Sequence, residues 1–144
     1  MNLFLILALL PGVVADDFEL PPDIVLDTYT VTGTLLGFQA GDYMHAVLRE
    51  RSGDIMSVMS PDPLLDYFLA GHVGETVVLE VEEVETYVIE AEEMVRTTRL
   101  AGAAAGETTY EEWADSLNAE GTPEELLGDY IRVPLDYPYE AGGR

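Results

Sequence analysis

The sequence predicts a mainly β protein: a small five-stranded barrel with a short helix between its third and fourth strands and a helical appendage at the C-terminus. Three observations support this class. Strand-length segments rich in Val, Thr, Leu and aromatic residues recur between residues 28 and 102, as is typical of strands. Gly, Pro, Asp and Ser separate these segments. Helical spacing of apolar residues occurs in two places, near residues 64–69 and 110–117.

Composition limits the classes of partner. The chain has 144 residues, about one domain, with 28 acidic residues, six Arg, no Lys and a formal net charge of -22. Phosphate backbones are bound by clustered Lys and Arg, so the charge opposes nucleic acid and anionic membranes as partners. The acidity is typical either of salt-adapted organisms or of an acidic secreted protein. Nearly half the residues are apolar, which favours a folded domain over a disordered one.

The first residues predict export. Residues 1–15 contain an apolar run from Leu3 to Leu10 and end at Ala15, the pattern of a signal peptide cleaved after a small residue. The alternative is a buried N-terminal strand. The run is too short for a membrane span, which needs about 20 residues. We therefore expect a periplasmic or extracellular protein, and the absence of Cys excludes disulfides and thiolate chemistry.

The next segments predict an arm and then a first strand. Residues 16–27 carry acids and Pro21-Pro22, so we expect an extended N-terminal arm. Residues 28–38 form the first expected strand, in which Gly33 and Gly37 mark points where the strand coils or bulges. Such points are needed where strands curve into a barrel.

Two more strands complete an expected antiparallel meander. Residues 43–49 alternate, so Met44, Ala46 and Leu48 share one face and Tyr43, His45 and Val47 share the other. Turn residues follow, and residues 55–60 form the third expected strand.

After residue 60 the spacing of apolar residues changes from that of a strand to that of a helix. Pro63 follows a capping Asp62, apolar residues recur at helical spacing, and Gly71 closes the segment. Residues 75–85 form the fourth expected strand, with alternate Val and Leu on one face and Glu on the other, and residues 94–102 form the fifth.

This order resembles the OB-fold, a five-stranded Greek-key barrel, over residues 28–102. More narrowly, the chain resembles a group of small exported bacterial domains through Gly41-Asp42-Tyr43, Gly74 with Val77, and Ile89-Glu90-Ala91. That resemblance implies a fold and an exported compartment, and it carries over no catalytic residue. Members of the group tend to have Gly after the last motif, where this chain has Glu92-Glu93.

Residues 103–144 are expected to form a linker, a helical appendage and an extended tail. The stretch "AGAAAGE", residues 101–107, is rich in small residues and predicts a linker. Thr109 and Glu112 have the spacing of a capping box, and Trp113 predicts that the helix packs. Residues 122–125 predict another helical turn.

The sequence gives no support for catalysis. Asp42 and His45 fall on opposite faces of a strand, which is the wrong geometry for a charge relay, and with His72 as the only other His no zinc motif is present. A serine nucleophile elbow is absent. Carboxylate pairs arise by chance among 28 acids, so a small hydrolase is the weakest hypothesis. We expect no cofactor.

The leading hypothesis is a binding module that is not an enzyme. OB-like barrels bind ligands on the face of the second and third strands, so the candidate ligand-binding residues are Tyr43, Met44, His45, Met56 and Tyr87. A protein, peptide or carbohydrate is the expected partner. The alternative is a calcium-dependent structural or adhesion protein of the cell envelope, with Glu80, Glu82, Glu83 and Glu85 as candidate metal ligands.

Overall fold

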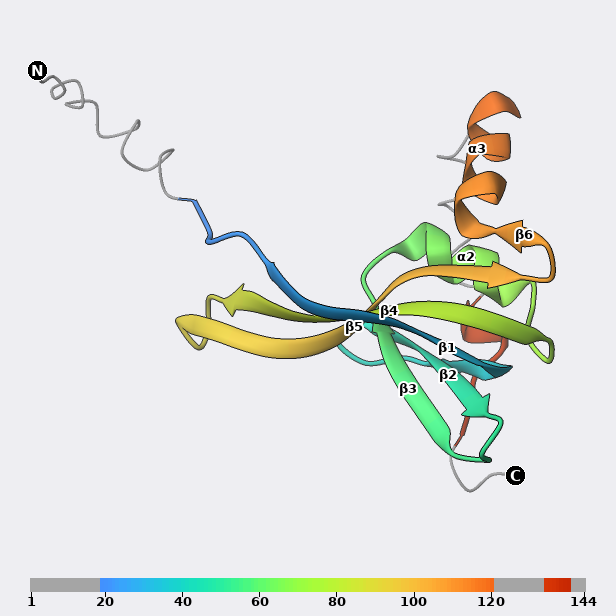
Figure 1. Ribbon diagram of the computed structural model, residues 1–144, viewed down its shortest axis with the longest axis horizontal. Helices are drawn as coiled ribbons and strands as arrows, with labels where there is room; N and C mark the ends of the chain where they lie inside the picture. Colours follow the sequence, from blue (N-terminus) through green and yellow to red (C-terminus); the bar gives the residue numbers. More distant parts are fainter. Residues whose placement is uncertain (1–18, 121–133, 141–144) are drawn as a thin grey trace, which may run out of the picture.

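The computed structural model describes residues 19–120 and 134–140, in which five strands close into a barrel. β1 (Ile24–Gln39), β2 (Met44–Glu50) and β3 (Ile55–Ser60) form an antiparallel meander. β4 (Thr76–Val88) pairs with β1, and β5 (Glu93–Ala105) pairs with β4. A parallel bridge between Met59 and Arg99 joins β3 to β5 (Figure 1). The predicted five-stranded barrel is confirmed, and its strand order is compatible with an OB-like fold.

The barrel interior is filled by apolar side chains from all five strands and the helix between β3 and β4. Alternate residues of β4 point inward, as expected, because the strand period is two. Among the residues described, no helix combines the length and the apolar composition that crossing a bilayer requires. The largest fully buried core side chains are Leu35, Leu48, Leu65, Leu69, Leu79 and Leu100.

β1 pairs with two different strands, and the two paired segments overlap at Gly33 and Thr34. The segment Ile24–Thr34 pairs with β4, and the segment Gly33–Gln39 pairs with β2. A Cβ atom on Gly33 would lie 2.3 Å from the carbonyl oxygen of Arg49, so only glycine permits this approach of backbones. Gly37, with φ +148°, lies where the register with β2 shifts. The two glycines predicted to coil the first strand are therefore where it changes partner and register.

β1, β4 and β5 extend past the barrel as a three-stranded ribbon, formed by residues 24–30, 82–88 and 93–99, which projects to the left in Figure 1. Strand pairing therefore begins at Ile24, inside the segment expected to be an unpaired arm. Polar contacts join the strands of the ribbon. Arg99 donates to Asp23 at 2.8 Å and to Glu82 at 3.1 Å, and the Tyr29 hydroxyl donates to Glu83 at 2.9 Å.

The turn between β4 and β5 contains a residue other than glycine in the left-handed backbone conformation. Glu92 has φ +55°, and its N–H donates to the carbonyl of Val88 at 2.7 Å. The turn geometry is thus formed by Glu, a residue that adopts this conformation at a cost of about 1 kcal/mol.

Two helices lie against the barrel, as predicted. α2 (Pro63–Ala70) begins after Asp62, whose carboxylate accepts from the N–H of Leu64 at 3.0 Å. α3 (Tyr110–Glu120) follows the short strand β6 (Thr108–Thr109). The capping box is confirmed, because Thr109 and Glu112 exchange side-chain to backbone hydrogen bonds at 3.1 Å.

Trp113 docks α3 onto α2. Its ring centroid lies 5.3 Å from that of Phe68 and 5.9 Å from that of Tyr67, within the range of favourable aromatic pairs. The predicted packing of the appendage is confirmed. The expected helical turn at residues 122–125 and the expected signal peptide at residues 1–15 lie outside the described residues.

The expected linker is wrong for residues 101–105, five of its seven residues. β5 continues to Ala105, and Ala103 and Ala105 are buried in the core. Ala and Gly have low strand propensity, so the sequence resembles a linker, but small side chains fit where strands of a barrel approach closely. Gly102 lies opposite Glu80, whose carboxylate would be 2.9 Å from an added Cβ.

Candidate functional site

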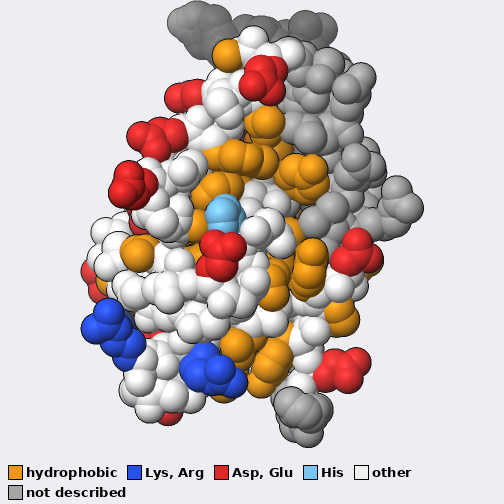
Figure 2. All heavy atoms as spheres, turned by 90° about the vertical axis from the view of Figure 1, so that its right-hand side faces the viewer, with side chains coloured by type: hydrophobic (Ala, Val, Ile, Leu, Met, Phe, Trp, Pro, Cys, Tyr) orange, Lys and Arg blue, Asp and Glu red, His pale blue; other side chains and the backbone are white. Residues whose placement is uncertain are grey.

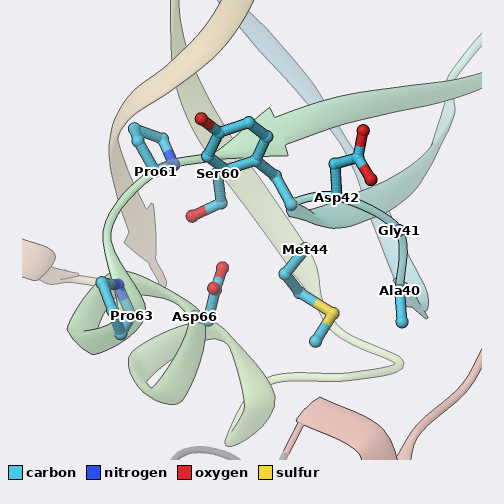
Figure 3. Close-up of a pocket in the computed structure, with 9 residues that line it drawn as sticks. Ala40, Gly41, Asp42, Met44, Ser60, Pro61, Pro63 and Asp66 are labelled. Atoms are coloured by element: carbon cyan, nitrogen blue, oxygen red, sulfur yellow. The ribbon is translucent and has the colours of Figure 1, made fainter.

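A pocket of about 210 Å³ lies at one corner of the barrel, between the β1–β2 loop and the junction of β3 with α2. We call it the corner pocket. It contains the Gly41-Asp42-Tyr43 motif together with a residue from α2, so it joins segments far apart in the sequence (Figure 3). The lining residues are Ala40, Gly41, Asp42, Tyr43, Met44, Ser60, Pro61, Pro63 and Asp66.

Asp66 is the buried acid of this pocket. Only 2 % of the residue is exposed, and its Oδ1 atom has no hydrogen-bond partner among the described residues. Burial raises the pKa of Asp66 to about 7, the Ser60 hydroxyl partly offsets this, and the negative charge of Asp62 raises the pKa further. Buried polar groups normally have a partner, so an unpartnered carboxyl oxygen beside a pocket points to a ligand.

The neighbouring acids are differently placed. Both carboxylate oxygens of Asp62 accept hydrogen bonds. The Leu64 N–H of α2 donates to Oδ1, and the Tyr110 hydroxyl donates to Oδ2 at 2.9 Å. The bond to Asp62 and burial raise the pKa of Tyr110 well above its usual range, with burial the larger cause. Figure 3 shows the carboxyl of Asp42 directed away from that of Asp66. Asp66 therefore differs from both neighbours in having a free buried oxygen.

This arrangement can exchange one proton or bind one cation. A carboxyl with a pKa of about 7 is neutral at mildly acidic pH, where it can donate a hydrogen bond, and charged at mildly alkaline pH, where it only accepts. Met44, Pro61 and Pro63 give the pocket apolar walls. The pocket is therefore suited to bind a single polar group that is attached to an apolar chain.

The structure brings two of the predicted site residues into this pocket. Tyr43 and Met44 line it, but Tyr43 precedes β2, which begins at Met44, and is 57 % exposed. The predicted start of the second strand at Tyr43 is wrong, because the loop continues through that residue. The phenol thus stands at the rim of the pocket instead of on a strand face.

His45 lies beside a different pocket. It shares that space with Leu135, Pro138 and Tyr139 of the C-terminal segment, and its Nδ1 lies 3.0 Å from the carbonyl oxygen of Tyr43. The C-terminal segment runs parallel to the end of β1, where the Phe38 N–H donates to the Tyr137 carbonyl at 3.0 Å. His45 and Tyr43 therefore do not line one shared pocket.

The remaining predicted ligand-binding residues are dispersed. Met56 is half-buried, pairs with Leu48 and packs against the core. Tyr87 pairs with Met94 near the tip of the ribbon, which Figure 1 places at the opposite end of the molecule from the β2–β3 hairpin. The five candidates do not form one site.

The four candidate metal ligands lie on two faces of β4, because side chains of a strand alternate. Glu80 and Glu82 share one face, and Glu83 and Glu85 share the other. Glu82 accepts from Arg99, and Glu83 accepts from Tyr29 and Thr98. Within residues 19–120 and 134–140 no group of three His, Asp or Glu side chains is placed to hold a metal ion.

We therefore expect calcium to have no specific effect on stability. The midpoint of thermal unfolding should be the same in EDTA and in millimolar calcium, once sodium chloride has been added to equal ionic strength to match screening. Calcium that bound only the folded state would raise the midpoint. A rise seen with calcium and not with magnesium or sodium would contradict this expectation.

Asp66 is the site residue that sequence reasoning missed. Its signal was present: Asp66 lies three residues before Leu69, on the buried side of the α2 stripe. An acid on an apolar helix face is unusual, since acids are rarely buried without a partner. Because the chain has 28 acidic residues, an acidic residue in a helix is not by itself a signal of a site.

Comparisons with models of known protein families, with curated proteins and with solved structures give no match to this chain.

Proposed function

We propose that this chain is an exported binding module without catalytic activity that recognises a protein or peptide through the corner pocket. One observation carries the proposal: the unpartnered, buried Oδ1 of Asp66 beside a pocket that has apolar walls. Sites for drug-sized ligands measure about 300–1,000 Å³, whereas this pocket measures about 210 Å³. The smaller size suits one side chain of a partner better than a sugar chain.

One face of the molecule has the composition of a surface that binds a macromolecule. Figure 2, which faces the end of the molecule bearing α2 and α3, shows apolar side chains gathered together with acidic side chains at their margins. Apolar centres with polar rims are typical of interfaces. A net charge of -22 would speed association with a basic partner through electrostatic steering.

Export rests on the sequence. The signal-peptide pattern of residues 1–15 and the resemblance to small exported domains both favour a periplasmic or extracellular site of action. Salt in that compartment would screen the repulsion between acids.

The test is a selection of peptides followed by a pocket-filling variant. Peptides from a displayed random library are selected on the wild-type chain, and their affinities are measured for Ala40→Phe and for Ala119→Phe. Both alanines are exposed, but only Ala40 lines the corner pocket. We expect the selected peptides to lose about tenfold or more in affinity for Ala40→Phe, the range of one lost anchor, and nothing for Ala119→Phe.

Amide chemical shifts locate the binding independently. Bound peptides should shift the resonances of residues 40–44 and of Asp66. Equal affinity for both variants, or a library that yields no binder, would count against the proposed function.

A further inference from the structure

We infer, on the basis of the proposed function, that the group bound in the corner pocket is the ammonium of a lysine side chain supplied by the partner. The inference starts from Asp66, whose carboxyl lines the pocket and has an unpartnered oxygen. A buried carboxylate is stabilised by a cation that donates hydrogen bonds to it. Among the described residues no Arg or His lines this pocket, so none of them supplies the cation.

The depth of the free oxygen favours an ammonium over a guanidinium. Oδ1 of Asp66 is fully buried and has no partner, whereas the Ser60 hydroxyl donates to the carbonyl oxygen of Asp62 at 3.3 Å. Arginine binds carboxylates best through two parallel hydrogen bonds from a planar group, whereas an ammonium is a compact point charge. A compact ammonium therefore fits one deeply buried oxygen better.

The walls of the pocket fit the stem of lysine. Met44, Pro61 and Pro63 line the path to Asp66 with apolar groups, against which four methylene groups can pack. Tyr43, exposed at the rim, offers an aromatic ring to a passing cation. In Figure 3 the Met44 side chain lies across the pocket from Asp66.

The lysine cannot belong to this chain. The sequence contains no Lys, so neither its own C-terminal tail nor a second copy can supply the side chain. Two copies would also repel each other, since each carries a net charge of -22. The occupant is thus a different, lysine-bearing protein or peptide.

Access to Asp66 needs a small movement. The residue is 2 % exposed, so a ligand reaches Oδ1 only when a neighbouring side chain swings aside. Met44 is suited to this, because methionine has three rotatable bonds and repacks easily.

Binding should depend on pH through Asp66. The groups around it are Ser60 on β3, Asp62 before α2, Asp42 and Tyr43 in the β1–β2 loop, and Tyr110 of α3, which bonds Asp62. Raising the pH ionises Asp66, whose pKa is about 7, while lysine stays protonated. The ammonium therefore binds more tightly at higher pH.

The test uses small probes that exclude non-specific binding of polycations. Nα-acetyl-lysine methylamide, the matching norleucine compound and the matching arginine compound are each titrated into the isotope-labelled full chain. We expect the lysine probe to shift amides of residues 40–44 and 66, and to bind about tenfold more tightly at about pH 8 than at about pH 6, following the ionised fraction of an acid with this pKa. The norleucine probe should not bind.

Two variants separate the pocket from general charge. Asp66→Asn should abolish the shifts, while Glu107→Gln, which removes one exposed acid elsewhere, should keep them. Equal binding to both variants, or tighter binding of the arginine probe, would overturn the inference. If selected peptides bind at the corner pocket but the lysine probe does not, this inference fails and the proposed function stands; if neither binds, both fail.

Discussion

Asp66→Asn will remove most of the loss of stability that the wild-type chain shows between about pH 4 and about pH 7. The substitution keeps the shape of the side chain and removes its charge. The effect should be largest at the alkaline end, where the buried carboxyl is ionised in the wild-type chain. At about pH 4, where Asp66 is protonated in the folded state, the two proteins should differ little.

The direction follows from proton binding. The pKa of Asp66 is about 7 in the folded chain against an ordinary value of 3.8, so the folded state holds the proton more tightly. Stability therefore falls as the pH rises from about 4 to about 7 and changes no further above that range. A tenfold change in proton affinity corresponds to about 1.4 kcal/mol, so the full cost is about 4 kcal/mol.

Denaturant unfolding at each pH measures this directly. The whole chain also loses stability as its many acids ionise, and molar salt suppresses that general repulsion. Glu107→Gln is the matched control, because it removes the same charge from an exposed site. If Asp66→Asn and Glu107→Gln have parallel pH profiles, the assignment of a strongly raised pKa to Asp66 is wrong.

Gly33→Ala will destabilise the barrel by about 3 kcal/mol or more, the upper range for overpacking. The added Cβ would lie 2.3 Å from the Arg49 carbonyl oxygen, and the obstructing atom is backbone, which cannot rotate away. β1 would have to separate from β2 at the point where it also pairs with β4. Thermal and denaturant unfolding give the loss of stability.

Gly41→Ala is the control for this substitution. A Cβ on Gly41 would meet its nearest atom, the Tyr43 carbonyl oxygen, at 3.6 Å, an ordinary contact. We expect a change within about 1 kcal/mol there, in line with a Gly to Ala change at a compatible site. Similar losses for both variants would show that glycine at residue 33 is not required by close approach.

The elements that could be predicted from the sequence are those with a local cause. The meander, α2 with its Asp62 cap, and α3 with its Thr109 capping box all follow from spacing and turn residues a few positions apart. The start of β1 and the end of β5 could not be predicted, since pairing between distant strands decides them. Ala103 and Ala105 belong to a strand because the barrel places them in its core.

The candidate site depended even more on tertiary structure. Tyr43 and Met44 were identified from their place on the expected second strand of an OB-like barrel, but their partner Asp66 lies on a helix that follows the third strand. Tyr87 was counted among the candidate ligand-binding residues because the alternating pattern does not predict how far β4 extends past the barrel. Periodicity assigns a residue to one face of its own helix or strand. Predicting a pocket also requires knowing which helices and strands pack together.

The ribbon gives one strand two kinds of environment. From Val77 to Val81, β4 is held by apolar packing in the barrel, while from Glu82 onward Val84 is its one fully buried side chain and its neighbours include the ion pairs of Arg99 and Arg96. Exposed polar pairs contribute little, about 0–1 kcal/mol each, so the free energy of local opening falls along the strand. The tip of the ribbon, beyond Val84, can therefore fray and re-form while the barrel stays closed.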